Sequence, residues 1–143
     1  MRPEISIEEL IERFEFFDDW TERYRYLIDL GRGLPSLDPA HRVDANIVKG
    51  CQSQVWLIHR RDDDTSDTLH FEADSDAHIV RGLIAILLTA FSGRTLAEIE
   101  AVDHDSLFET LGLTHHLSPS RTNGLFSMVS KIRALARVST ESN

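Results

Sequence analysis

The chain has 143 residues, of which 41% are hydrophobic and 27% charged, and this composition excludes disordered, collagen-like and disulfide-scaffold proteins. Its length predicts a single domain over residues 1–143. The formal net charge of -9 disfavours nucleic acid as a partner, because an acidic surface repels phosphates. The longest apolar run, 83–91, is too short to cross a bilayer, and the first residues show no apolar signal segment. We therefore expect a cytoplasmic protein that contacts no membrane.

Two amphipathic helices are predicted at the start of the chain. The first begins after Ser6 and the second after Asp19, and each of these caps is followed three residues later by a glutamate. Apolar side chains recur at helical intervals in both segments, which predicts that one face of each helix is buried. The second helix is expected to end at Gly31 and Gly33.

A β-hairpin is predicted in the middle of the chain. Residues 34–48 are broken by Pro, Asp and Asn, which is typical of a loop, and they leave room for one short edge strand. Residues 54–60 and 68–73 are rich in β-forming side chains, and the polar segment 62–67 connects them. In the second strand apolar and polar residues alternate, so one face of the sheet is expected to pack and the other to be wet.

Helices are predicted for the second half of the chain. Residues 74–76 (Asp-Ser-Asp) are expected to cap a helix over 79–90, in which Gly82 permits a neighbour to approach closely. A short helix is expected after Thr95, which has the spacing of a capping box with Glu98, and another is expected around 106–111. A longer helix begins at Ser118 and Pro119, although the pair 123–124 (Asn-Gly) also favours a turn. Helices packed on a small antiparallel sheet predict an α+β fold.

Cys51 is the single cysteine, so the chain forms no internal disulfide and no multi-cysteine zinc or iron-sulfur site. A lone cysteine is most often a small buried hydrophobe. Its neighbours here are Gly50 and Gln52 rather than apolar residues, and Gly50 lets the backbone bend. A thiol presented on a loop is therefore the alternative, and a nearby cation such as Lys49 or a helix start would favour thiolate.

Other candidate residues carry weaker signals. Arg121 either anchors the Cys51 loop, contacts a partner, or is a solvated surface residue. Asp76 is explained locally as a helix cap, and Lys49 as a solvated loop residue. The seven histidines include no pair at i, i+4 spacing and Cys51 has no cysteine near it, so we expect no metal site.

Three sequence blocks together resemble the signature of the SufE family of sulfur-acceptor proteins. They are residues 50–56 (Gly-Cys-Gln-Ser-Gln-Val-Trp), residues 74–83, and residues 117–125 (Leu-Ser-Pro-Ser-Arg-Thr-Asn-Gly-Leu), in the family's order and at similar spacing. The resemblance spans nearly the whole chain and implies an α+β fold shared with IscU-type scaffold proteins. CsdE proteins carry the same motifs, so the resemblance leaves the SufE and CsdE roles open.

The resemblance implies that Cys51 accepts a persulfide sulfur from a cysteine desulfurase of the SufS or CsdA kind. The chain would stimulate that enzyme and pass the sulfur to an iron-sulfur scaffold, as a relay protein rather than a stand-alone enzyme. It would hold no cofactor, because the pyridoxal phosphate (PLP) resides on the desulfurase, and we expect a monomer or weak homodimer. The residues expected to support the loop and contact the partner are Lys49, Gly50, Gln52, Asp76 and Arg121.

One thiol suits the carriage of sulfur, because a second cysteine would attack the persulfide, release sulfide and close a disulfide. A persulfide also needs shelter from oxidants and small thiols, and we expect Gly50 to act as the hinge between a sheltered and an exposed position. Two other functions stay open. The chain could be a non-covalent adaptor with Cys51 incidental, or a small thiol hydrolase or transferase, for which no base and orienting residue are indicated.

Overall fold

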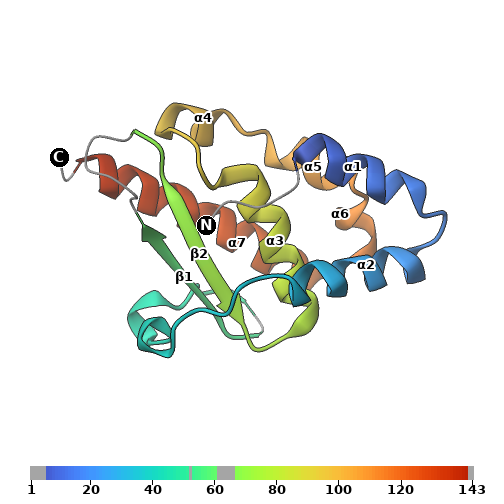
Figure 1. Ribbon diagram of the computed structural model, residues 1–143, viewed down its shortest axis with the longest axis horizontal. Helices are drawn as coiled ribbons and strands as arrows, with labels where there is room; N and C mark the ends of the chain where they lie inside the picture. The colour runs from blue at the N-terminus through green and yellow to red at the C-terminus, as the bar shows by residue number, and fades with distance from the viewer. Residues whose placement is uncertain (1–5, 52, 61–66, 142–143) are drawn as a thin grey trace.

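The computed structural model describes residues 6–51, 53–60 and 67–141. Its elements, in chain order, are α1 (Ile7–Phe16), α2 (Trp20–Arg32), η1 (Pro39–His41), η2 (Asp44–Asn46), β1 (Val55–Arg60), β2 (His70–Ser75), α3 (His78–Phe91), α4 (Leu96–Ala101), α5 (His104–Thr110), α6 (Leu113–His116) and α7 (Pro119–Glu141). Figure 1 shows the helices arranged around a short two-stranded ribbon. The predicted α+β class is confirmed.

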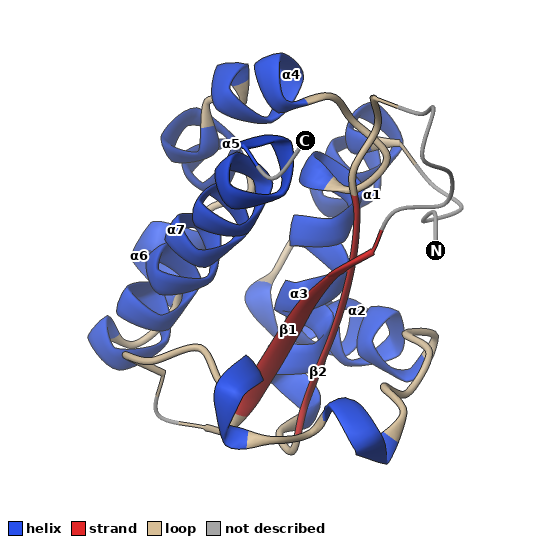
Figure 2. Ribbon diagram, turned by 90° about the vertical axis from the view of Figure 1, so that its left-hand side faces the viewer, coloured by secondary structure: helices blue, strands red, loops and turns tan. Residues whose placement is uncertain are grey.

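The sheet consists of β1 and β2, paired antiparallel from Val55 opposite Ser75 to Arg60 opposite His70. Helices α3 and α7 pack against this hairpin, as Figure 2 shows. Phe71 and Ala73 are buried, as the predicted alternation requires. The second strand begins and ends two residues later than predicted. Most of the connection predicted at 62–67 lies outside the described residues.

The loop predicted at 34–48 contains η1, η2 and one β-bridge. Ile47 forms that bridge with Trp56, and the N–H of Val48 donates to the carbonyl of Val55 at 2.9 Å. The expected edge strand is therefore present in its shortest form. Arg42 from this loop lies over the indole of Trp56, with its guanidinium carbon 5.7 Å from the ring centroid.

The predicted caps of the first helices and of α4 are formed, because each offers a side-chain oxygen to an unpaired helix N–H. Ser6 Oγ accepts from Glu9 at 3.1 Å, Asp19 Oδ1 accepts from Glu22 at 2.9 Å, and the capping box between Thr95 and Glu98 is complete in both directions. The prediction that residues 74–76 cap α3 is wrong. β2 continues through Ser75, so α3 begins later and its N-cap is Ala77, whose methyl side chain cannot accept a capping bond.

Two glycines allow α2 and α3 to pack in close contact. A Cβ added to Gly82 would lie 2.1 Å from the carbonyl oxygen of Leu27, and one added to Gly31 would lie 2.8 Å from the backbone nitrogen of Gly82. The predicted close approach at Gly82 is confirmed. Gly31 lies inside α2 rather than at its end, and the helix stops at Gly33, so only the second of the two predicted stops is correct.

The last helices also differ from the prediction. Helix α6 was not predicted, because it has only four residues and no periodicity to detect. It follows Gly112, whose φ of 76° is the left-handed conformation that glycine adopts easily. Helix α7 runs without a break through Asn123 and Gly124, so no turn forms there. No helix in the described part of the chain is both long and apolar enough to cross a membrane.

Candidate functional site

Cys51 lies on the loop that leads into β1, with its side chain half-buried against α7. Its Sγ donates to the carbonyl oxygen of Gly124 at 3.6 Å. A Cβ built on Gly124 would lie 3.3 Å from that sulfur, so no larger residue fits there without displacing the thiol. The sequence allows a turn at Gly124 as the alternative to the predicted helix, whereas in the structure Gly124 lies within α7 and lets Cys51 pack against that helix. A glycine at an interior helix position is the sequence signal for such close contact.

The thiol borders a small cavity of about 20 Å³. Its walls come from the Cys51 loop, from α3 and from the first turns of α7, and the lining residues are Cys51, Ser53, Val80, Leu83, Ser120, Arg121, Gly124 and Met128. A space that holds one water-sized sphere needs roughly 10–15 Å³ by this measure. The cavity therefore has room for about one atom beyond the sulfur of Cys51.

Burial raises the pKa of the Cys51 thiol above its ordinary value. The low polarity around the sulfur disfavours the charged thiolate, which is the nucleophilic form. The carbonyl of Gly124 also interacts favourably only with a sulfur that carries a proton to donate. At neutral pH the resting site therefore holds a protonated thiol of low reactivity.

Gly50 precedes the thiol in a conformation that only glycine adopts easily, with φ of 93°. A Cβ at this position would also lie 2.6 Å from Ser127 Oγ on α7. The backbone conformation therefore favours glycine at this position, and a larger residue would also require Ser127 to move. The turn at Gly50 brings the backbone of the Cys51 loop onto the surface of α7.

The other side of the loop is held at Gln54 by contacts with Ser75 and Asp76, which we call the clamp at Gln54. The N–H of Gln54 donates to Asp76 Oδ1 at 3.2 Å, and its carbonyl accepts from Ser75 Oγ at 2.7 Å. Ser75 Oγ in turn accepts from the N–H of Ala77 at 3.2 Å. Asp76 therefore contacts the loop rather than capping α3, which corrects its local interpretation. Sequence reasoning did not find the role of Ser75, because a serine at a strand end carries no distinguishing pattern.

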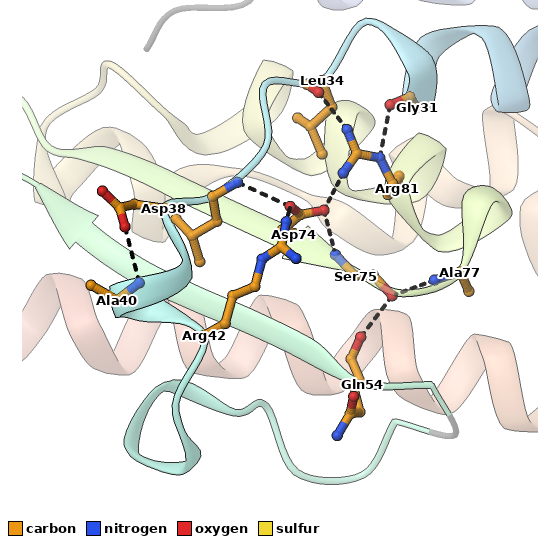
Figure 3. Close-up of polar contacts among 11 residues, drawn as sticks. Gly31, Leu34, Asp38, Ala40, Arg42, Gln54, Asp74, Ser75, Ala77 and Arg81 are labelled. Carbon is orange, nitrogen blue, oxygen red and sulfur yellow. Dashed lines mark hydrogen bonds and ion pairs between the residues drawn. The ribbon is translucent and has the colours of Figure 1, made fainter.

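Behind this clamp lies Asp74, whose carboxylate is 0% exposed. Figure 3 shows the two arginines that approach it from different segments. Arg42 Nη2 donates to Oδ2 at 2.7 Å, and Arg81 on α3 donates to Oδ1. The N–H groups of Leu37 and Ser75 also donate, at 2.9 and 2.8 Å. Asp74 thus joins the 34–48 loop, β2 and α3 at the base of the site.

Arg81 extends this network to the end of α2. It donates from Nε to the carbonyl of Gly31 at 3.0 Å and from Nη2 to the carbonyl of Leu34. Burial alone would raise the pKa of Asp74, but the N–H donors of Leu37 and Ser75 and the charges of Arg81 and Arg42 outweigh burial and lower it. Asp74 is therefore ionised at neutral pH and paired on both oxygens.

The remaining predicted residues lie at different distances from the thiol. Arg121 is half-buried and lines the cavity beside Cys51, and its backbone N–H donates to Ser118 Oγ at 3.2 Å. Lys49 is exposed on the loop. Gln52 lies outside the described residues. Across 6–51, 53–60 and 67–141, no group of three or more His, Cys, Asp or Glu side chains is arranged to hold a metal ion.

Comparison with known proteins gives a consistent match. Residues 8–136 match the family model described as SufE: Fe-S metabolism associated domain. An uncharacterized SufE-like protein of Rhizobium etli is 49% identical over 134 residues, covering 93% of this chain and 90% of that protein. Another, of Rhizobium meliloti, is 47% identical over 132 residues, covering 92% and 94%. The solution structure of a hypothetical protein from Thermus thermophilus shares the fold, with a TM-score of 0.75 over 99% of each chain at 17% identity.

Proposed function

We propose, since this chain belongs to the SufE family, that Cys51 accepts a sulfane sulfur from the persulfide of a PLP-dependent cysteine desulfurase and carries it toward iron-sulfur cluster assembly. Family membership itself establishes a sulfur-transfer role linked to iron-sulfur metabolism. The observation that supports Cys51 as the sulfur acceptor is its position beside a cavity with room for about one further atom. A persulfide differs from a thiol by one sulfur atom.

The transfer is a thiol exchange in which every atom and electron is accounted for. The Cys51 thiolate attacks the outer sulfur of the desulfurase persulfide, a new bond forms between Sγ and that sulfur, and the old sulfur-sulfur bond breaks. The electron pair of the broken bond leaves with the desulfurase cysteine as its thiolate. Cys51 becomes a persulfide, and no external oxidant or reductant is consumed.

Because burial raises the pKa of Cys51, the thiol must lose its proton before it can attack the persulfide. The resting thiol is protonated and faces the carbonyl of Gly124, so it reacts slowly with small molecules. Movement of the thiol out of its half-buried position, about Gly50, would expose it to water and to the charges of a partner and so favour thiolate. The clamp at Gln54 limits this movement to the short segment between Gly50 and β1.

Arg121 and Lys49 are two basic residues near the thiol, the first in space and the second in sequence. Arg121 lines the cavity, and Lys49 is exposed two residues before Cys51. A cation beside the sulfur stabilises the attacking thiolate. We therefore propose that a desulfurase of the SufS or CsdA kind docks over this face, and that Asp76 holds Gln54 in place while the loop moves.

The test is mass spectrometry of the intact protein after incubation with a SufS-type desulfurase and free cysteine. The native chain should gain the mass of one sulfur atom, and dithiothreitol should remove it. Cys51→Ser should gain nothing and should no longer stimulate the desulfurase. An unlabelled native chain would refute sulfur acceptance, and full stimulation by Cys51→Ser would identify a non-covalent adaptor instead.

A further inference from the structure

A second cavity lies away from Cys51, along the outer edge of β2. It has a volume of about 450 Å³, within the usual range of ligand pockets, and shares no lining residue with the cavity beside the thiol. Helices α1, α2 and α3 and the segment 33–37 enclose it. Its apolar lining includes Leu10, Leu30, Leu37, Phe71, Ala85 and Ile86. Figure 2 shows α1 and α2 on the side of β2 that faces away from β1.

The sheet register determines which backbone groups of β2 face this cavity. The N–H of Val48 reaches the carbonyl of Val55 on the outer side of β1, so Val55 and Leu57 direct their backbone polar groups away from β2. Ala73 is the partner of Leu57 and belongs to the same type of pair. Its N–H and carbonyl therefore point away from β1. The N–H of Phe71, which donates to Ser92 Oγ at 3.0 Å, confirms this direction.

The outer edge of β2 is closed at both ends and open between them. At one end Leu69 exchanges hydrogen bonds with Arg94 and Gly93, at 2.8 and 2.7 Å. At the other end Asp74 Oδ2 accepts from the N–H of Leu37 at 2.9 Å. Among the described residues, no hydrogen bond is made by the outward N–H and carbonyl of Ala73, which is only 5% exposed. Buried backbone groups almost always have a partner, so this pair indicates a binding position.

We propose that the cavity receives a short, extended, apolar segment of a partner protein, which adds to the outer edge of β2 as a further strand. A residue opposite Ala73 would accept from its N–H and donate to its carbonyl, as in an antiparallel ladder. The side chains of the incoming segment would contact the apolar lining. The N–H and the carbonyl of Ala73 point the same way along a strand edge, and one residue of an extended peptide backbone presents a carbonyl and an N–H at the matching spacing. We therefore infer that the occupant is a peptide.

The charges around the cavity favour an uncharged segment. Each ionisable side chain of the lining already has an intramolecular partner, and the pairs are Arg13 with the hydroxyl of Tyr26 at 3.3 Å, Asp29 with Arg32 at 3.4 Å, and Glu72 with Arg60 at 2.7 Å. A charged peptide side chain would have to displace one of these contacts or stay unpaired on an apolar surface. This site is separate from Cys51, so a partner held here leaves the thiol accessible.

The experiment titrates the full chain with the peptide acetyl-Val-Ala-Val-amide and follows backbone amides by NMR. Binding should shift the Ala73 amide saturably and slow its hydrogen exchange at least fivefold. The same peptide methylated on the nitrogen of its central residue should bind at least fivefold more weakly, because it lacks the donor. Ala85→Phe, which fills the cavity from α3, should abolish binding, and Ala97→Phe on the exposed side of α4 should not.

Three outcomes would overturn the proposal. The first is the absence of a saturable shift at Ala73, which would mean that water alone satisfies the edge. The second is equal binding of the methylated peptide, or equal binding by Ala85→Phe and native protein. The third is protection of the Ala73 amide that depends on protein concentration without peptide, which would identify a second copy of the chain as the occupant. Persulfide formation on Cys51 is measured separately, so failure here does not bear on sulfur acceptance.

Discussion

Replacing Gly124 is predicted to move the Cys51 thiol while leaving the fold intact. In Gly124→Ala the new Cβ would lie 3.3 Å from Sγ, against an ordinary contact distance of about 3.5–4.0 Å, so the sulfur must shift by a few tenths of an ångström. Alanine stabilises a helix interior over glycine by about 1 kcal/mol, which offsets the cost of this tight contact. The free energy of unfolding should therefore stay within about 1 kcal/mol of native.

A larger side chain at the same position should expel the thiol. Gly124→Leu places several atoms where Sγ and the Cys51 backbone now lie, at a cost of about 1–3 kcal/mol for overpacking if the loop stays in place. Release of the loop avoids that cost and exposes the sulfur. Its pKa should then fall toward the ordinary value, and alkylation at neutral pH should speed up about tenfold for each unit of that fall.

The assay is the rate of Cys51 alkylation by iodoacetamide, with urea unfolding measured on the same samples. Asn123→Ala, at the exposed neighbouring position of α7, is the matched control and should react like native protein. The expected order of rates is native, then Gly124→Ala, then Gly124→Leu. A folded Gly124→Leu that reacts no faster than the control would show that Gly124 does not shelter the thiol.

Three further changes test other parts of the site. Gly50→Ala should lower the free energy of unfolding by about 1–2 kcal/mol, since φ of 93° strains any residue with a Cβ. Gly33→Ala is the control, because its added Cβ meets only ordinary contacts, and it should lower the free energy of unfolding by less in the same urea titration. The pH at which alkylation of native Cys51 reaches half its maximum should lie above that of an unstructured cysteine peptide, because burial raises its pKa; an equal midpoint would mean that the thiol is already exposed. Asp74→Asn should lower the free energy of unfolding by about 3–5 kcal/mol, because Arg81 loses its charge partner. In the native protein the stability that Asp74 contributes should be present above about pH 4 and lost as the pH falls through the lowered folded-state pKa of Asp74. Urea titrations that show the same acid dependence in the variant would contradict this.

Much of the fold could be predicted because its helices begin at local signals. Ser6, Asp19 and Thr95 cap helices through bonds to N–H groups only three residues away, so the sequence carries the complete interaction. The start of α3 was mispredicted for the opposite reason. Asp74 looks like a helix cap, yet its partner Arg42 lies 32 residues away and meets it only in the folded chain.

In the candidate site too, features set by neighbouring residues could be predicted, and features set by residues distant in sequence could not. The loop position of Cys51 follows from its glycine and polar neighbours, which are adjacent in sequence. The walls of its cavity come from α3 and from Gly124 on α7, which lies 73 residues away, so no local pattern predicts them. The cavity at the edge of β2 was not predicted either, because it depends on which backbone groups the sheet register leaves unpaired.

The small volume beside Cys51 also limits how many sulfur atoms one protein molecule can carry. If the thiol carries sulfur as proposed, a space of about 20 Å³ accommodates one added atom and excludes a longer polysulfane chain. Any second atom added to the carried one would project past the walls formed by α3 and α7, where reducing agents would remove it. The protein would then deliver its cargo singly, and the number of sulfur atoms handed over would equal the number of encounters with the donor.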